Sequence, residues 1–300
     1  MTLAGRRRAR RAPGEPGLIG YVYILPGLIV FIALVIVPLI QTGWSSLFRW
    51  DGVTEPIWVG LRNYVDLAGD PLLAQAFVHS LILVVFYSWI PICIALALAT
   101  FLTRFRVRGM TTFRAVLFLP QIVPMVVVAL AWRWIFANSG PLNSVLGSVG
   151  LGSLVHPWLG DFTTGLPALG LVGSWVMYGL CLVLFLAGIQ RIPRDLYEAA
   201  RVDGAGVKPE FLAVTLPGLR NELVVALVVT TIAGLRAFDL VYMTTRGGPG
   251  NSTIVPTFLI VNRAFTTGQV GSSAAIAVVL TAIVLLASAV IIRLGEGRAR

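Results

Sequence analysis

The stretch around which this sequence is organised reads Tyr197-Glu198-Ala199-Ala200-Arg201-Val202-Asp203-Gly204-Ala205 and runs on to Leu216-Pro217. Pro193 suits the first turn of a short helix, and Gly204 can take the left-handed conformation that ends one. A second short helix can begin at Pro209, and it is expected to end near Pro217 because proline disfavours helix before it. The segment therefore predicts two short helices joined at a glycine. On composition alone, an ordinary solvated loop is the simpler interpretation.

The composition is that of a membrane protein. Of 300 residues, 57% are hydrophobic and only 12% are charged, and the mean hydropathy is +0.87. Soluble domains carry roughly 25% charged residues, so an integral membrane chain is expected. Cys93 and Cys181 both lie in apolar runs and are interpreted as packing residues rather than a disulfide framework.

Six transmembrane helices are predicted, and Pro91, Pro120 and Pro124 fall inside them, where neighbouring helices can satisfy the freed backbone groups. The first span has 23 residues without a charge, which is enough to cross the bilayer and too long for the apolar region of a signal peptide. The predicted spans cover residues 18–40, 77–102, 115–136, 166–188, 223–245 and 273–292.

The distribution of Lys and Arg predicts the orientation. Residues 1–17 hold five, the 103–114 loop four, the 189–221 loop five and the 293–300 tail three, whereas the loops on the opposite side hold four in all. Both termini and the 189–221 loop are therefore expected to be cytoplasmic. The net charge of +10 follows from this topology, so no nucleic-acid partner is expected. The extracytoplasmic loop 41–76 is too short to form a domain of its own.

The sequence carries no recognisable catalytic or metal-binding motif. It has no G-x-x-x-x-G-K-[ST], no H-E-x-x-H and no Cys/His cluster with ligand spacing. The glycine-rich stretch 247–253 lacks a lysine and is interpreted as an outer turn. A membrane-embedded hydrolase would have to use Ser272 with His79, a pairing that is more simply a coincidence. A secondary transporter would need ion-coupling residues and usually internal repeats, and neither is visible.

Polar residues inside the predicted spans are the other candidates for function. Arg236 and Asp239 stand three apart on the fifth span, so they are expected to share a face and can pair. Two interpretations are open: the pair lines a polar path through the membrane, or it is a structural ion pair near the outer boundary. Gln121, between two prolines, can face the same path or bond a neighbouring helix.

The opening stretch resembles the EAA loop of ABC importer permeases. The match consists of Glu198-Ala199-Ala200, Gly204, an aliphatic residue and Leu216-Pro217. The aliphatic position is Val214, where the family usually has isoleucine. Further motifs resemble the carbohydrate-uptake branch, and the early part resembles the first of the two paired sugar permeases. These motifs are Phe238-Asp239-Leu240-Val241-Tyr242 with the glycine-rich stretch 247–253, Phe118-Leu119-Pro120, Val59-Gly60-Leu61-Arg62-Asn63-Tyr64, Pro26, Pro38 and Trp50-Asp51.

This resemblance implies an all-α type I ABC importer permease fold, with a five-helix core at residues 77–292. It implies a second permease, a pair of ATPase subunits, an extracytoplasmic sugar-binding protein and a carbohydrate substrate as partners. ATP and Mg would be bound by the ATPase, so this chain is not expected to be an enzyme or to hold a cofactor or metal. The expected contacts with the ATPase are Glu198, Ala199, Ala200, Asp203, Gly204, Leu216 and Pro217. The candidates for lining the sugar path are Gln121, Tyr178, Arg236, Asp239 and Tyr242.

Overall fold

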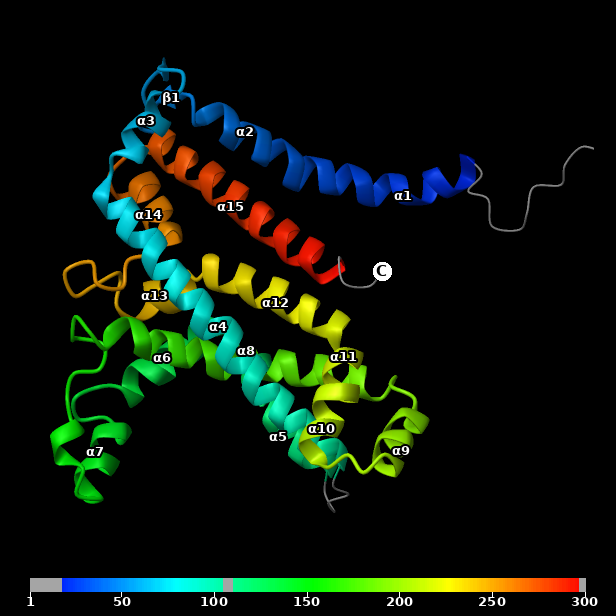
Figure 1. Cartoon of the computed structure of the whole chain (residues 1–300). Coiled ribbons are helices and arrows are strands. Elements are labelled where there is room, and N and C mark those ends of the chain that lie inside the picture. Colours follow the sequence, from blue (N-terminus) through cyan, green and yellow to red (C-terminus); the bar gives the residue numbers. More distant parts are fainter. Residues whose placement is uncertain (1–17, 105–109, 297–300) are drawn as a thin grey trace, which may run out of the picture.

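The computed structural model describes residues 18–104 and 110–296. Within these residues the chain is built of helices, with one short antiparallel hairpin of β1 (Phe48–Arg49) and β2 (Ile57–Trp58) (Figure 1). Five helical spans are long and apolar enough to cross a membrane, and a bent helix pair supplies a sixth. The prediction of a six-span helical membrane protein is confirmed.

The first span is one continuous helical run that stands apart from the core. It comprises α1 (Leu18–Phe31), the π-helix η1 (Ile32–Ile36) and α2 (Val37–Ser45), so it ends five residues later than expected. Its side chains from Tyr21 onward are almost all exposed, and α2 alone packs on another long helix, α15 (Val270–Glu296) (Figure 1). This leaves a long apolar helix face for lipid or another chain.

The core is centred on α4 (Pro71–Arg104), which packs along α8 (Gly165–Ile189) and α12 (Arg220–Leu235). Gly173 of α8 lets the helices approach closely, because an added Cβ would lie 1.9 Å from the Tyr87 ring. Hydroxyl bonds join the same helices: Ser174 donates to the Phe86 carbonyl at 2.7 Å, and Thr230 to the Ser88 hydroxyl at 2.9 Å. Close packing and internal hydrogen bonds therefore hold the core without help from water.

The third span is broken. Helix α5 (Met110–Ile122) and helix α6 (Met125–Ile135) meet at 101°, so the span predicted over residues 115–136 is a sharply bent helix pair rather than one kinked helix. Pro124 is the N-cap of α6, with ψ 136°. It has no N–H to continue α5 and disfavours helix at the preceding residue, so the chain turns there.

The fifth span is also interrupted. Helix α12 ends at Leu235, and a shorter helix, α13 (Asp239–Thr244), follows after a non-helical step. The hydroxyl of Thr257 donates to the Ala237 carbonyl at 2.8 Å, which satisfies one freed backbone group. The expectation that Arg236 and Asp239 share a helix face is therefore wrong, and the two form no ion pair in the described part of the chain.

The remaining elements lie at the two ends of the core. At the end predicted to be extracytoplasmic are α3 (Arg62–Ala68), α7 (Pro141–Ser148), η2 (Gly152–Leu154), α14 (Pro256–Val261) and η4 (Asn262–Thr266). The expected outer turn is present there, with Gly247 at φ 85° and Gly250 at φ 52°. At the opposite end are α9 (Arg194–Val202), α10 (Val207–Glu210), η3 (Phe211–Thr215) and α11 (Leu216–Gly218) (Figure 1).

Candidate coupling surface and interior path

Residues 194–218 form a two-helix knob, and its first helix stops at Gly204 as expected. Gly204 has φ +80°. Its N–H donates to the Arg201 carbonyl at 3.0 Å, and the N–H of Ala205 donates to the Ala200 carbonyl at 2.8 Å. These two bonds form the Schellman motif. A Cβ on Gly204 would meet nothing within 4 Å, so the backbone conformation, and not space, requires glycine here.

The second helix of the knob begins earlier than expected and ends close to the expected residue. It starts at Val207 rather than Pro209 and runs through α10, η3 and α11 to Gly218. The N–H of Leu216 donates to the carbonyl of Phe211, five residues back. This π-turn shifts the hydrogen-bond register just before Pro217, which then occupies a first-turn position of α11, where no N–H is needed. The helix then ends at Gly218, so the expected end near Pro217 is confirmed.

Side-chain contacts clasp the two helices of the knob together. The guanidinium of Arg201 donates from Nε to Glu210 Oε2 at 2.9 Å and from a terminal nitrogen to Oε1 at 3.5 Å. The Tyr197 hydroxyl lies 3.2 Å from the Thr215 hydroxyl. The hydrogen bond from Glu210, followed by its charge, raises the pKa of Arg201. With the Glu210 side chain only 8% exposed, this pairing keeps the knob one unit.

The knob is joined directly to the membrane helices. An added Cβ at Gly188, in the last turn of α8, would lie 2.5 Å from the fully buried Leu219, which links the knob to α12. Arg191 and Glu222 form an ion pair at 3.6 Å across the same junction. Arg220 donates to the carbonyl of Gly295 near the end of α15. The knob is therefore in direct contact with the ends of α8, α12 and α15.

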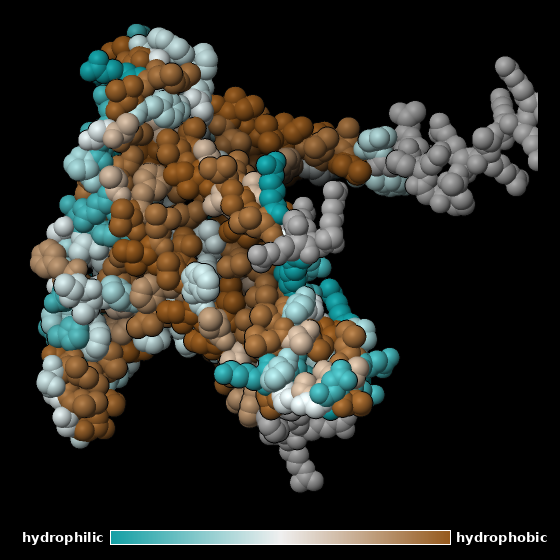
Figure 2. Space-filling model, in the orientation of Figure 1, coloured by the Kyte–Doolittle hydropathy of each residue, from teal (hydrophilic) through white to brown (hydrophobic). Residues whose placement is uncertain are grey.

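The exposed surface of the knob combines apolar with hydrophilic side chains (Figure 2). The side chains of Glu198 and Asp203 are exposed and form no hydrogen bond or ion pair with other described residues, although the Glu198 charge contributes to the raised pKa of Arg201. Ala199 and Pro217 are exposed as well, and Ala200 and Leu216 are half-buried. The exposed apolar residues are Leu196 at 52%, Val202 at 87%, Val207 at 56% and Leu212 at 57%. Such a face, at the end of the molecule away from the outer loops, suits a protein partner.

A polar side chain lies unpartnered at the break in the third span. Gln121 stands in the last turn of α5, and its side-chain oxygen is buried with no hydrogen-bond partner among the described residues. Its Cβ would lie 3.4 Å from a Cβ placed at Gly179 of α8, and the half-buried Tyr178 precedes that glycine. The structure thus brings Gln121 beside the turn of α8 that carries Tyr178. A buried carbonyl without a partner offers a bond to a ligand hydroxyl.

The other three path candidates lie together at the break between α12 and α13. Arg236 and Asp239 are both exposed there. The Tyr242 ring stacks on Phe238 with centroids 5.0 Å apart, and the Arg246 guanidinium lies 5.8 Å from the Tyr242 ring. Phe238 and Arg246, which contact Tyr242, are not among the path residues predicted from the sequence. The spacing of four between Phe238 and Tyr242 was the available signal, since it puts both rings on one helix face.

The residues of the hydrolase alternative have other partners. Ser272 accepts a hydrogen bond from Arg263 at 2.8 Å, and His79 Nδ1 lies 2.9 Å from the Ile254 carbonyl. Among residues 18–104 and 110–296, no group of three or more His, Cys, Asp or Glu side chains is arranged to hold a metal ion. Neither Ser272 nor His79 is therefore set up as a nucleophile and base pair.

Comparison with known proteins gives one consistent result. Residues 90–296 match the family described as binding-protein-dependent transport system inner membrane component. The chain is 34% identical over 286 residues to the trehalose/maltose transport system permease protein of Thermococcus litoralis, covering 93% of this chain and 94% of that one. It is 31% identical over 299 residues to the diacetylchitobiose uptake system permease protein of Streptomyces coelicolor, covering 96% and 85%.

The fold matches a solved structure as well. The crystal structure of a bacterial ABC transporter involved in the import of the acidic polysaccharide alginate contains a chain with TM-score 0.80, at 20% identity, covering 94% of this chain and 96% of that one. The arrangement of α4 to α15 is therefore a known membrane-protein fold.

Proposed function

The chain belongs to the binding-protein-dependent transport system inner membrane component family, and from this premise we propose that it is the permease subunit of an ATP-driven carbohydrate importer. The resemblance to permeases named for trehalose, maltose and diacetylchitobiose supports a sugar as cargo. Members of this family are transport subunits and not enzymes, so ATP hydrolysis with its Mg belongs to a partner.

The observation that carries the proposal is the clasped knob joined to the membrane helices. Glu198 and the exposed apolar residues around it form the face that docks on the ATPase. Arg201 and Glu210 keep the two helices of the knob together, so the two helices move as one body when the ATPase displaces the knob. Closure of an ATPase pair then moves the ends of α8 and α12, and the core rocks between inward-open and outward-open states.

The interior of the importer uses the break in the third span. Gln121 offers its unpartnered carbonyl to a sugar hydroxyl, and Tyr178 supplies a ring and hydroxyl on the neighbouring helix. The pair meets the general need of sugar sites for planar polar groups and aromatic faces. The group around Tyr242 lies along the same route nearer the outer end.

The remaining partners follow from the surfaces left uncovered. The first span, exposed from Tyr21 onward, packs on a second permease or on lipid in this proposal. The excess of Lys and Arg in the 189–221 loop supports a cytoplasmic location for the knob and both termini. An extracytoplasmic sugar-binding protein docks at the opposite end.

Reconstitution tests the function. We expect proteoliposomes with the complete importer to accumulate sugar only when ATP and the binding protein are present. Glu198→Lys should abolish stable ATPase binding, whereas Glu55→Lys, the same charge reversal at an exposed carboxylate at the opposite end of the core, should retain it. Uptake that persists without ATP and stops when an ion gradient is removed would contradict the proposal and favour a secondary transporter.

A further inference from the structure

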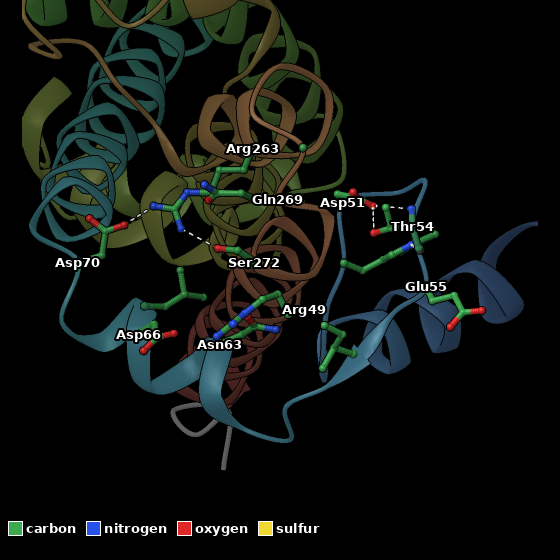
Figure 3. Close-up of a pocket in the computed structure, with 14 residues that line it drawn as sticks. Arg49, Asp51, Thr54, Glu55, Asn63, Asp66, Asp70, Arg263, Gln269 and Ser272 are labelled. Atoms are coloured by element: carbon green, nitrogen blue, oxygen red, sulfur yellow. Dashed lines mark hydrogen bonds and ion pairs between the residues drawn. The ribbon is translucent and has the colours of Figure 1, made fainter.

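A pocket of about 650 Å³ opens at the extracytoplasmic end, away from the interior path (Figure 3). It lies between the loop that joins β1 to β2, helix α3 and the junction of η4 with α15. Its size falls in the range of small-molecule sites, roughly 300–1,000 Å³. The residues that the argument uses are Arg49, Trp50, Asn63, Asp70, Arg263 and Gln269.

The walls of this pocket are held in place by close contacts. The N–H of Gly271, in the first turn of α15, donates to the Trp50 carbonyl at 3.3 Å. An added Cβ at Gly271 would lie 1.9 Å from the Phe48 carbonyl oxygen, so β1 rests directly on α15. The Asn63 amide donates to the Phe48 carbonyl at 2.9 Å and to the Ser46 carbonyl at 2.7 Å. The pocket is therefore a formed site rather than a gap between loose loops.

A largely buried ion pair forms one wall. Arg263 donates to the Asp70 carboxylate and, at 2.8 Å, to the Ser272 hydroxyl (Figure 3). The two charged side chains are 16% and 19% exposed. Because Asp70 neutralises Arg263, this guanidinium does not attract a further anion strongly.

Three polar groups that line the pocket have no hydrogen-bond partner among the described residues. The side chains of Arg49 and Gln269 make no hydrogen bond or ion pair with any described residue, and the Asn63 carbonyl oxygen accepts none. Trp50 has its indole N–H engaged by the Thr54 carbonyl at 2.7 Å, which leaves the ring itself for packing. The site thus offers the Arg49 guanidinium, the Gln269 amide, the side-chain oxygen of Asn63 and an aromatic ring.

We propose that this pocket is a second carbohydrate-binding subsite, which receives a neutral sugar at the outer face before it enters the interior path. Planar polar side chains can bond adjacent sugar hydroxyls in pairs, and an indole ring packs on a sugar face. The carboxylates of Asp51, Glu55 and Asp66 also line the pocket. Since these outnumber the one unpaired guanidinium, the pocket disfavours sugars that carry carboxylates.

This inference rests on the proposed function, and one labelling experiment separates the two. The complete importer in lipid nanodiscs is exposed to maltotriose and diacetylchitobiose that carry a photoreactive diazirine, and labelled residues are mapped by mass spectrometry. We expect labels at residues 49–54 and 263–272, removed by excess unlabelled neutral sugar and not by an equal concentration of alginate oligosaccharide. Gln269→Ala and Arg49→Ala should each reduce labelling about fivefold, the loss of roughly one hydrogen bond. Val53→Ala, on the same loop and 92% exposed, should leave it unchanged.

Three results would contradict the outer subsite, and each has a different consequence for the proposed function. Labels confined to the interior path, with normal uptake, would overturn the outer subsite and leave the sugar importer intact. Unchanged sugar labelling in Gln269→Ala, with weakened docking of the binding protein, would show that the pocket receives that protein instead. If no neutral sugar is labelled or taken up, both the subsite and the proposed cargo are wrong.

Discussion

Substitution of Gly204 by alanine isolates the contribution of one backbone conformation to coupling. Gly204 ends the first helix of the knob at φ +80°, and a Cβ there would touch nothing within 4 Å. The cost of alanine is therefore the strain of a left-handed residue alone, about 1–2 kcal/mol. That strain changes the equilibrium between the clasped knob and altered conformations by a factor of roughly 5–30.

The assay is ATPase binding and ATP-driven uptake by the reconstituted importer. We expect Gly204→Ala to weaken ATPase binding by up to that factor, while sugar-binding affinity on the permease is unchanged. Gly204→Asn should lose less, because asparagine tolerates the left-handed region better. Gly206→Ala is the matched control: Gly206 has φ −76° and also has nothing within 4 Å of an added Cβ. Equal behaviour of Gly204→Ala and Gly206→Ala would refute the reasoning.

Three further substitutions test other parts of the structure. Arg201→Glu should reduce coupling of ATP hydrolysis to uptake, and the double swap with Glu210→Arg should restore much of it; failure of the swap in a folded complex would argue against the clasp. Asp70→Asn should destabilise the outer end by about 2 kcal/mol in thermal unfolding, since Asp70 accepts charge-assisted bonds from Arg263. Burial opposes ionisation of Asp70, but Arg263 and backbone N–H groups outweigh it and lower its pKa. The stability from this ion pair is fully present above the pKa of Asp70 in the unfolded chain, and it is lost as the pH falls through the lower pKa in the folded chain. The difference in unfolding free energy between wild type and Asp70→Asn should therefore narrow in acid. A difference that stays constant with pH would contradict the assignment. Gln121→Leu should raise the sugar KM of uptake several-fold without weakening ATPase binding, and an unchanged KM would remove Gln121 from the path.

The sequence was most informative where local chemistry decides the structure. Apolar runs of membrane length located every span, because a segment without charges has few other stable environments. Gly204 was identifiable as a helix stop, since few other residues adopt a positive φ at low cost. The residues from Pro193 to Pro217 predicted the two short helices of the knob, and the coupling role of the motif around Glu198 stays a prediction.

The breaks in the third and fifth spans depend on tertiary contacts. Pro124 was visible, but proline within a membrane helix is compatible with a kink or a full break, and packing decides between them. At residues 236–238 no proline marks the end of α12. The hydroxyl of Thr257, 20 residues later in the chain, bonds the Ala237 carbonyl and makes the break tolerable. Arg236 and Asp239 were therefore assigned to one face of a helix that does not continue.

The outer pocket could not be predicted from the sequence, because it too depends on contacts between distant residues. Arg263 and Asp70 are separated by 193 positions, and no periodicity connects them. The π-turn at residues 211–215 was equally invisible, because Pro217 signals the end of a helix unless the register has already shifted.

The most direct test of the coupling permease assignment is gentle detergent extraction of the tagged chain, followed by identification of the proteins that remain bound. We expect a second six-span permease and a P-loop ATPase, with the ATPase lost in Glu198→Lys and retained in Glu55→Lys. A chain that is extracted alone or as a homodimer, and still transports sugar after reconstitution without ATP, would contradict the assignment.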